Sequence, residues 1–220
     1  MSQTDHHYYT IVDDCKQYNA TLAAVSKTRT IEETNVLYNM GQRVFAENRA
    51  QELIAKAPEM ADDIEWHLIG HLQTNKVRNI MPFVHCIQSL DSARLFNKIN
   101  SEALRVNKQV ICLLQIKLSK EESKSGWSYD ALNHFLREGH HNNFDNISIE
   151  GIMGMTTLTT DQILIREELR QLKGYYDKLK TDFFSQSDRF NTLSMGMSGD
   201  YKIALEEGST MVRIGSLLFS

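Results

Sequence analysis

The chain has 220 residues and a formal net charge of −4, with 41% of its residues hydrophobic and 24% charged. This length and balance predict one globular domain, residues 1–220, and argue against a disordered or fibrous chain. The mild negative charge argues against nucleic acid or an anionic membrane as a partner. No run reaches the roughly 18 apolar residues that span a bilayer, and the N-terminus lacks a signal peptide's apolar stretch. We therefore expect a cytoplasmic protein.

The cysteines indicate a reducing compartment. There are three of them, Cys15, Cys86 and Cys112, widely spaced and without a Cys-x-x-Cys motif. We expect free thiols. Cys86 and Cys112 lie in apolar runs, so buried packing is their expected role.

In chain order, the pattern alternates between strands and helices. A helix is expected over residues 4–19, before the first strand. Eight short apolar runs then predict strands at Leu22–Ser26, Arg43–Glu47, Glu65–Ile69, Val84–Ser89, Val110–Lys117, Ile147–Met153, Thr192–Met195 and Met211–Ile214. Helical patterns lie between or after them near residues 30–40, 49–57, 72–80, 92–106, 128–139, 161–182 and 199–207. This alternation predicts a parallel α/β fold, and the strand count favours a closed (β/α)8 TIM barrel.

The glycines also favour a barrel over an open sheet. An open sheet normally carries a glycine-rich phosphate turn after its first strand, whereas here Ser26-Lys27-Thr28 follows that strand. The glycines Gly196, Gly199 and Gly215 come late. A phosphate site after the seventh and eighth strands is the usual place in a barrel.

Lys27 ends the apolar run Thr21–Lys27. A lysine at the end of a buried strand can carry chemistry, because a neutral amine forms a Schiff base with an aldehyde. The alternative from spacing alone is an ordinary surface lysine after a strand. Lys117 also follows an apolar run, and we expect it to flank the mouth of the barrel.

Two late segments have the form of phosphate-binding turns. In Ser194-Met-Gly-Met-Ser198-Gly-Asp200, glycines allow backbone amides to approach an anion and Ser198 adds a hydroxyl. Arg213-Ile-Gly215-Ser216 adds a second turn, and strand alternation points Arg213 inward. A buried arginine needs an acceptor or anion. An amine together with a phosphate site indicates pyridoxal 5'-phosphate (PLP) as the ligand.

The segment Trp66–Lys76 is dense in polar groups after the third strand. We expect His67 to hydrogen-bond Asn48 or the ligand, and His71 to belong to a helix start. His67 and His71 as metal ligands lack an HExxH motif or a cysteine partner, so no metal site is predicted.

Together, these segments resemble the pyridoxal phosphate homeostasis proteins (the YggS/PROSC-type PLP-binding proteins) over about residues 21–219. The motifs that carry the resemblance are Ala24-Val-Ser-Lys27-Thr, Glu47-Asn48-Arg-Ala-Gln51-Glu52, Trp66-His67-Leu-Ile-Gly70-His-Leu-Gln73-Thr-Asn75-Lys76, Ser123-Lys124-Ser-Gly126, Gly151-Ile-Met153-Gly-Met155, Ser194–Asp200 and Gly208–Gly215.

The resemblance implies a single-domain barrel like the N-terminal domain of alanine racemase (fold type III), with PLP held as an aldimine on Lys27. By position, Ser198, Gly199, Gly215 and Ser216 would bind the phosphate, and Arg213 would face the ring. Asn48 and Met195 would line the pocket.

Three departures from the family pattern stand out. Ala46 replaces the usual glycine of Phe-Gly-Glu-Asn, so its methyl either tightens the backbone beside the ring or is harmless. Ser216 replaces a threonine and keeps the hydroxyl. The segment Gly154–Thr160 differs from common relatives.

The function that the resemblance implies is a non-catalytic PLP carrier that buffers the cofactor, acts as a monomer and serves PLP-dependent apoenzymes. Racemisation needs a second acid/base, which racemases of this fold take from an additional β domain that we expect to be absent here. The rival is a racemase-like enzyme in which Tyr129, Tyr201 or His67 is that second base. A third reading is a Schiff-base aldolase for a phosphorylated sugar.

Overall fold

The computed structural model describes residues 3–118, 125–139 and 145–219. Ser123 and Lys124 of the family motif lie outside the described residues. The strands are β1 (Thr21–Val25), β2 (Val44–Glu47), β3 (Glu65–Leu68), β4 (Val84–Leu90), β5 (Val110–Lys117), β6 (Ile147–Met155), β7 (Thr192–Ser194) and β8 (Met211–Ile214). The helices are α1 (Gln3–Gln17), α2 (Ile31–Asn39), α3 (Ala50–Lys56), α4 (Val77–Ile80), α5 (Ala93–Arg105), α6 (Tyr129–Arg137), α7 (Gln162–Phe183) and α8 (Tyr201–Glu206), with 3-10 turns at Ala57–Glu59 and Thr74–Lys76.

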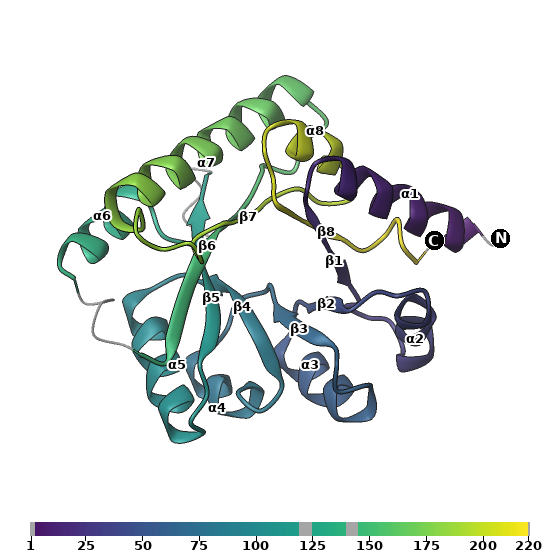
Figure 1. Cartoon of the computed structure of the whole chain (residues 1–220), viewed down its shortest axis with the longest axis horizontal. Coiled ribbons are helices and arrows are strands. Elements are labelled where there is room, and N and C mark those ends of the chain that lie inside the picture. The colour runs from purple at the N-terminus through teal and green to yellow at the C-terminus, as the bar shows by residue number, and fades with distance from the viewer. Residues whose placement is uncertain (1–2, 119–124, 140–144, 220) are drawn as a thin grey trace.

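The strands close into a barrel. They pair in parallel in the order β1 to β8, and β1 pairs back to β8, with Ala23 opposite Arg213. Helices α2 to α8 lie around the outside, and α1 comes before the first strand (Figure 1). The predicted (β/α)8 barrel with an extra N-terminal helix is thus confirmed.

Local chemistry explains where several helices begin. Thr30 and Glu33 form a reciprocal capping box at the start of α2. The side chains of Ser92 and Ser128 accept hydrogen bonds from the backbone of α5 and α6, and Asp161 does the same for α7. Each cap satisfies amide hydrogens that have no partner within the helix. The caps therefore fix the residue at which each of these helices begins.

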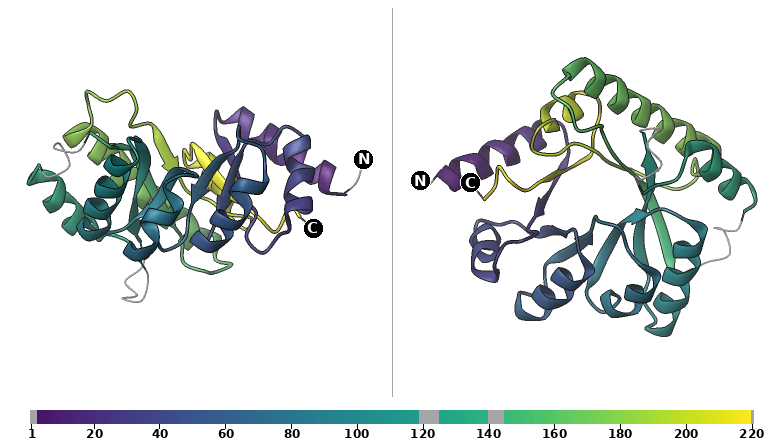
Figure 2. Two further views of the ribbon diagram at one scale, coloured as in Figure 1. Left: turned by 90° about the horizontal axis from the view of Figure 1, so that it is seen from below. Right: turned by 180° about the vertical axis from the view of Figure 1, so that it is seen from behind.

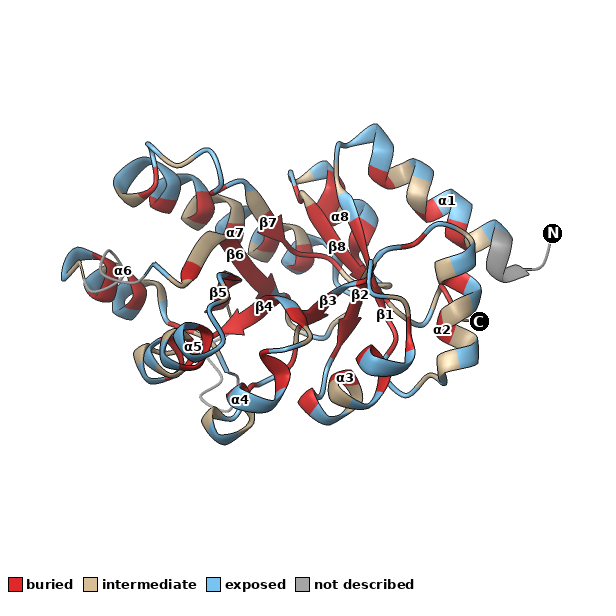
Figure 3. Ribbon diagram, turned by 60° about the horizontal axis from the view of Figure 1, so that its bottom comes forward, coloured by how far each residue is buried: buried red, intermediate tan, exposed pale blue. Residues whose placement is uncertain are grey.

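The buried apolar residues form three clusters. The larger cluster fills the space between the barrel and its helices, and buried residues follow the inward faces of α5, α6 and α7 (Figure 3). Two small clusters lie apart from it, one of Ala23, Val25, Ala46 and Met211 and the other of Cys86, Leu113 and Met153.

The three cysteines are free, as the sequence predicted, and buried; burial was predicted for Cys86 and Cys112 and is found for Cys15 as well. Burial raises the pKa of the Cys15 thiol to about 11 and raises that of Cys86 well above its ordinary value. These thiols are therefore protonated at neutral pH and serve as packing groups.

The first helix is tied to the barrel. The hydroxyl of Tyr201 in α8 donates to Asp14 of α1 at 2.9 Å. The two chain ends lie on the same side of the molecule in all views (Figures 1 and 2). Within the described parts of the chain, no helix has the length and apolar character needed to cross a bilayer.

Candidate functional site

A cavity of about 400 Å³ opens where the carboxyl ends of the strands meet. Such a position is where (β/α)8 barrels bind ligands, because loops from all the strands converge there. The lining residues are Val25, Lys27, Asn48, Ile69, Met155–Thr159, Ile165, Met197–Asp200, Arg213, Gly215 and Ser216. Seven of the eight residues predicted to bind the cofactor are among them: Lys27, Asn48, Ser198, Gly199, Arg213, Gly215 and Ser216.

Lys27 lies just beyond β1, on an exposed turn at the rim of the cavity. The next residue, Thr28, has a left-handed backbone with φ of 63°. This conformation is costly for a β-branched residue. The Thr28 amide donates to the Glu52 carboxylate at 2.9 Å, which holds the turn in place. The turn that presents the amine is therefore fixed by a specific bond from α3.

A buried ion pair supports this turn from behind. Glu47, at the end of β2, is fully buried, and its Oε1 accepts from Ser26 Oγ and from Lys56 Nζ, each at 2.7 Å. Lys56 also donates to the backbone oxygen of Ser26 at 2.6 Å. Burial raises the pKa of Glu47, and the hydrogen bonds from Lys56 and Ser26 oppose that rise. Glu47 therefore holds the residue before Lys27 and does not line the cavity.

The segments after β7 and β8 contribute a group of donors without acceptors to the same cavity. Among the described residues, nothing accepts the backbone amide hydrogens of Ser198, Gly199 and Ser216. The Gly215 amide makes only a long contact, 3.4 Å, to Ser198 Oγ. A methyl group added to Gly199 would meet nothing within 4 Å. Free amides and hydroxyls around open space suit a phosphate group, so these residues fit the acidic end of PLP.

Arg213 points into the barrel, as strand alternation predicted, and is 3% exposed. Its Nη1 donates to Ser194 Oγ at 2.7 Å and its Nη2 to the Gly154 carbonyl at 2.9 Å. Burial lowers the pKa of the guanidinium to about 10, while nearby Asp200 favours the charged form. Arg213 thus remains a cation at neutral pH, on the cavity floor.

The segment after β6 forms one wall of the cavity. Thr156 Oγ1 donates to Asp200 Oδ2 at 2.8 Å, and the Asp200 Oδ1 accepts from the Met197 amide at 2.6 Å. Thr157 donates twice to Glu168 of α7. These bonds give Thr156 and Thr157, within the departure at 154–160, a role: they tie this wall to the segment after β7 and to α7.

The other departure, Ala46, lies below the cavity. It is fully buried with Ala23, Val25 and Met211, and Val25 itself lines the cavity. The methyl group is thus accommodated within a packed cluster.

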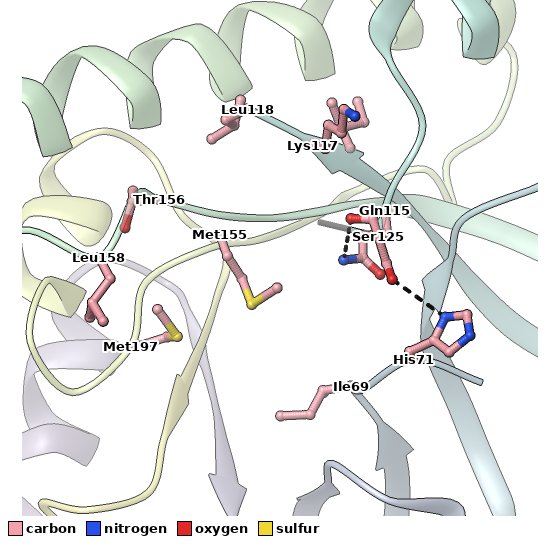
Figure 4. A pocket seen from close by; sticks show the side chains of 11 residues that line it. Ile69, His71, Gln115, Lys117, Leu118, Ser125, Met155, Thr156, Leu158 and Met197 are labelled. Carbon is pink, nitrogen blue, oxygen red and sulfur yellow. Dashed lines mark hydrogen bonds between the residues drawn. The ribbon is translucent and has the colours of Figure 1, made fainter. Parts of the chain in front are cut away.

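A second cavity of about 280 Å³ lies beside the first and shares Ile69, Met155, Thr156, Leu158 and Met197 with it. Its far side carries His71, Gln115, Lys117 and Ser125 (Figure 4). His71 contacts Asp91 at 3.1 Å, and Gln115 donates to the Ser125 carbonyl at 3.1 Å. Lys117 therefore lines the mouth, as expected, but in the neighbouring cavity.

Four residues that the sequence offered for the pocket do not line it: Met195, His67, Tyr129 and Tyr201. Met195 is fully buried in the larger core cluster and is absent from the cavity wall, where Met197 takes its place. Ser194, one residue earlier, points into the barrel, so alternation directs Met195 outward. His67 contacts Gln88 at 2.8 Å and does not bond Asn48. Neither Tyr129, which stacks on Tyr175, nor Tyr201, which bonds Asp14, lines either cavity.

A closed parallel barrel with a lysine and a turn of unpaired amides at its mouth is typical of the racemase-domain class. The family model described as "Alanine racemase, N-terminal domain" matches residues 1–220. Two curated relatives are named pyridoxal phosphate homeostasis protein. The one from Aquifex aeolicus is 36% identical over 91% of this chain and 86% of its own length. The one from Synechocystis is 39% identical over 90% of this chain and 89% of its own.

A solved structure agrees in fold and family. PipY from Synechococcus elongatus, with PLP bound, matches with a TM-score of 0.83 and 32% identity, over 92% of this chain and 93% of PipY. The chain belongs to the family of pyridoxal phosphate homeostasis proteins, within the alanine racemase N-terminal domain group.

Proposed function

We propose that the chain binds PLP through Lys27 and holds it as a carrier and buffer of the cofactor, without a reaction of its own. The observation that carries this proposal is one cavity that is lined both by Lys27 and by Ser198, Gly199 and Ser216, whose backbone amides are unpaired among the described residues. Relatives named for PLP homeostasis, and PipY with PLP bound, support the choice of ligand.

Each part of the site then has a role. The Lys27 amine would bind the PLP aldehyde covalently, and the amides and hydroxyls of Ser198, Gly215 and Ser216 would hold the phosphate. Arg213 would face the ring side. Bound PLP supplies an electron sink. An arginine keeps its own proton at neutral pH and gives none to the ring nitrogen, so this side chain weakens that sink.

The cavity is lined by few groups that could act as acid or base, and this supports a carrier over a racemase. Moving a proton between the two faces of a substrate needs a base on each face. Among the described residues that line the first cavity, the ionisable side chains are Lys27, Asp200 and Arg213. Both Asp200 oxygens are engaged, by Thr156 and by the Met197 amide. The residues predicted as a second base, Tyr129, Tyr201 and His67, line neither cavity.

A visible-absorbance titration of the PLP-free protein with PLP tests the binding proposal. Wild type is expected to turn yellow with a stoichiometry of one. In Lys27→Ala, binding should weaken by more than about tenfold, which is 1.4 kcal/mol, and the yellow band should be lost. Lys117→Ala is the matched control, because Lys117, like Lys27, lies at the carboxyl end of a strand but lines the neighbouring cavity. A colourless wild type without PLP uptake would reject the proposal and favour the aldolase reading.

Exchange of the α-hydrogen tests the absence of a reaction. The PLP-loaded protein is incubated with a panel of amino acids in deuterated buffer, and deuterium at Cα is followed by NMR. We expect no exchange above that of free PLP. Exchange that disappears in Lys27→Ala would instead establish the racemase-like enzyme.

The apoenzymes that receive PLP, the monomeric state and a cytoplasmic location stay predictions. Gel filtration of the loaded protein checks the monomer. Transfer of PLP to an apo-aminotransferase, faster than free diffusion of released PLP allows, checks direct delivery.

A further inference from the structure

A group of metal-binding side chains lies at the amino ends of β3 and β4, opposite the cofactor cavity. Glu65 begins β3, His67 follows two residues later on the same strand, and His85 is the second residue of β4. One potential ligand atom from each of the three lies within 4.8 Å of the other two. The proposed PLP function uses none of these side chains.

The burial of the three side chains suits a site that is anchored but open. His67 is only 4% exposed, whereas the side chains of Glu65 and His85 are 49% and 43% exposed. An ion can therefore enter from solvent and find one fixed ligand and two adjustable ones.

The distances are close to those of a tetrahedral zinc site. His85 Nε2 lies 3.7 Å from Glu65 Oε2, and the imidazole centroids of His67 and His85 are 5.9 Å apart. Ligands that are each about 2.0–2.2 Å from zinc lie roughly 3.3–3.6 Å from one another. The His85–Glu65 pair is thus within a few tenths of an ångström of this spacing, and the ligand atom of His67 lies within 4.8 Å of both, so the two half-exposed side chains must move toward His67 to close the set.

Gln88 supplies the contact that orients the buried ring. Its amide nitrogen lies 2.8 Å from His67 Nδ1, which leaves Nε2 for a metal ion. Ligand histidines commonly use their second nitrogen in such a bond. Because a metal on Nε2 requires the proton to be on Nδ1, the Gln88 amide must then turn its oxygen toward His67.

This rotation of the Gln88 amide affects the cofactor cavity through two further hydrogen bonds. Ser194 Oγ donates to the Gln88 oxygen at 2.7 Å and accepts from Arg213 Nη1 at 2.7 Å. When the amide of Gln88 turns, Ser194 faces an NH₂ group and its hydroxyl loses that acceptor. The environment of Arg213, on the floor of the cavity, changes with it.

We propose that Glu65, His67 and His85 form a binding site for a divalent transition metal at the end of the barrel opposite the PLP cavity. Two imidazoles and one carboxylate match Zn²⁺, with the fourth position left to water. Magnesium and calcium prefer a shell made of oxygen ligands, so they do not suit this set.

Equilibrium dialysis of the untagged chain against Zn²⁺ tests the site. We expect wild type to hold one zinc ion more than His85→Ala or Glu65→Gln, each of which alters a half-exposed side chain. Affinity at that site should fall by more than about 100-fold, since loss of outer contacts alone costs 10–100-fold. The other histidines stay in every variant, so zinc that they bind cancels in the comparison.

His134→Ala is the matched control. His134 Nε2 lies 3.3 Å from Glu138 Oε1, so this variant also removes an exposed histidine beside a glutamate. His134 is not part of the cluster of Glu65, His67 and His85. Its zinc stoichiometry should equal that of wild type. If His85→Ala keeps the wild-type stoichiometry and affinity, or if wild type binds no zinc, the site is rejected.

The coupling to the cavity rests on the proposed function. Zinc should change the dissociation constant for PLP by at least about fivefold in wild type, within the usual range of coupling between sites, and should have no effect in His85→Ala. Equal PLP affinity with and without zinc in wild type would reject the coupling. Zinc binding by a protein that takes up no PLP would support the metal site and reject the proposed function.

Discussion

Replacing Lys56 by methionine should sharply destabilise the barrel, because it leaves a buried carboxylate without its cation. Glu47 is fully buried and the Lys56 side chain is 9% exposed, and they meet at 2.7 Å. Removing one partner of such a pair costs about 3–5 kcal/mol. In a domain of this size, 1 kcal/mol shifts the melting temperature by about 2–4 °C. We therefore expect a fall of roughly 6–20 °C.

Urea unfolding at neutral pH, followed by far-UV circular dichroism, measures the effect. Lys16→Met is the matched control, since Lys16 pairs with Asp13 at 3.4 Å with both side chains 73% exposed. An exposed pair contributes at most about 1 kcal/mol. The double variant Glu47→Met/Lys56→Met should recover most of the loss, because an apolar pair of similar volume replaces a buried ion pair at little cost.

The pH dependence identifies the cause. Without Lys56, the pKa of Glu47 in the folded state rises further above its unfolded value, so folding takes up a proton. The Lys56→Met defect should therefore be smaller at pH 5 than at pH 8. A loss below about 1 kcal/mol, equal to that of Lys16→Met and independent of pH, would refute the reasoning.

Three further predictions concern the site and the barrel interior. A methyl group at Gly70 would lie 2.0 Å from the Asn48 carbonyl oxygen, so Gly70→Ala should cost about 1–3 kcal/mol and weaken PLP binding in the absorbance titration. Its control, Gly174→Ala in α7, meets nothing within 4 Å and should stabilise by about 0.5–1 kcal/mol; equal effects would contradict the packing argument. Ser198→Ala should weaken PLP binding by roughly 10–100-fold through loss of a charge-assisted hydrogen bond, and unchanged affinity would remove Ser198 from the phosphate site. Below about pH 6.5, His67 is protonated in the unfolded state, whereas in the folded state it is protonated only near pH 3. The free energy of unfolding should therefore fall by about 1.4 kcal/mol per pH unit as the pH is lowered through that window. Urea titrations in which His67→Gln keeps the full slope would contradict this assignment.

The sequence was sufficient for the strand order and most of the cavity because both depend on local patterns. Apolar runs separated by helical periodicity predicted each of the eight strands to within two residues at either end. Convergence of strand ends then placed Lys27, Asn48 and Ser216 in one cavity, since a closed parallel barrel brings these ends together.

The contacts that the sequence missed depend on pairing across the fold. β6 extends to Met155, where Gly154 lets α7 approach so closely that a methyl group would lie 2.5 Å from Leu172. Nothing local indicates that Lys56, on a helix, turns inward to meet Glu47. The polar wall at Thr156 also depends on a partner 44 positions later, Asp200.

For His67 and Met195, the alternation of side chains along the strand already indicated the observed location. His67 lies between Glu65 and Ile69 on the inward face of β3, so it belongs to the barrel interior and finds Gln88 on the next strand. β7 ends at Ser194, and Gly196, with φ of 94°, interrupts the strand alternation, so that Met197 lines the cavity. At these two positions, the alternation of inward and outward side chains along the strand predicts the location better than membership of the family motif does.

Peptide mapping after borohydride reduction of the PLP-loaded protein tests the central claim most directly. Reduction fixes a Schiff base as a stable secondary amine, so mass spectrometry locates the modified side chain. The account predicts one pyridoxyl group per chain, on Lys27, in wild type and in Lys117→Ala. A pyridoxyl group on Lys117 or another lysine of wild type, or none at all, would contradict it.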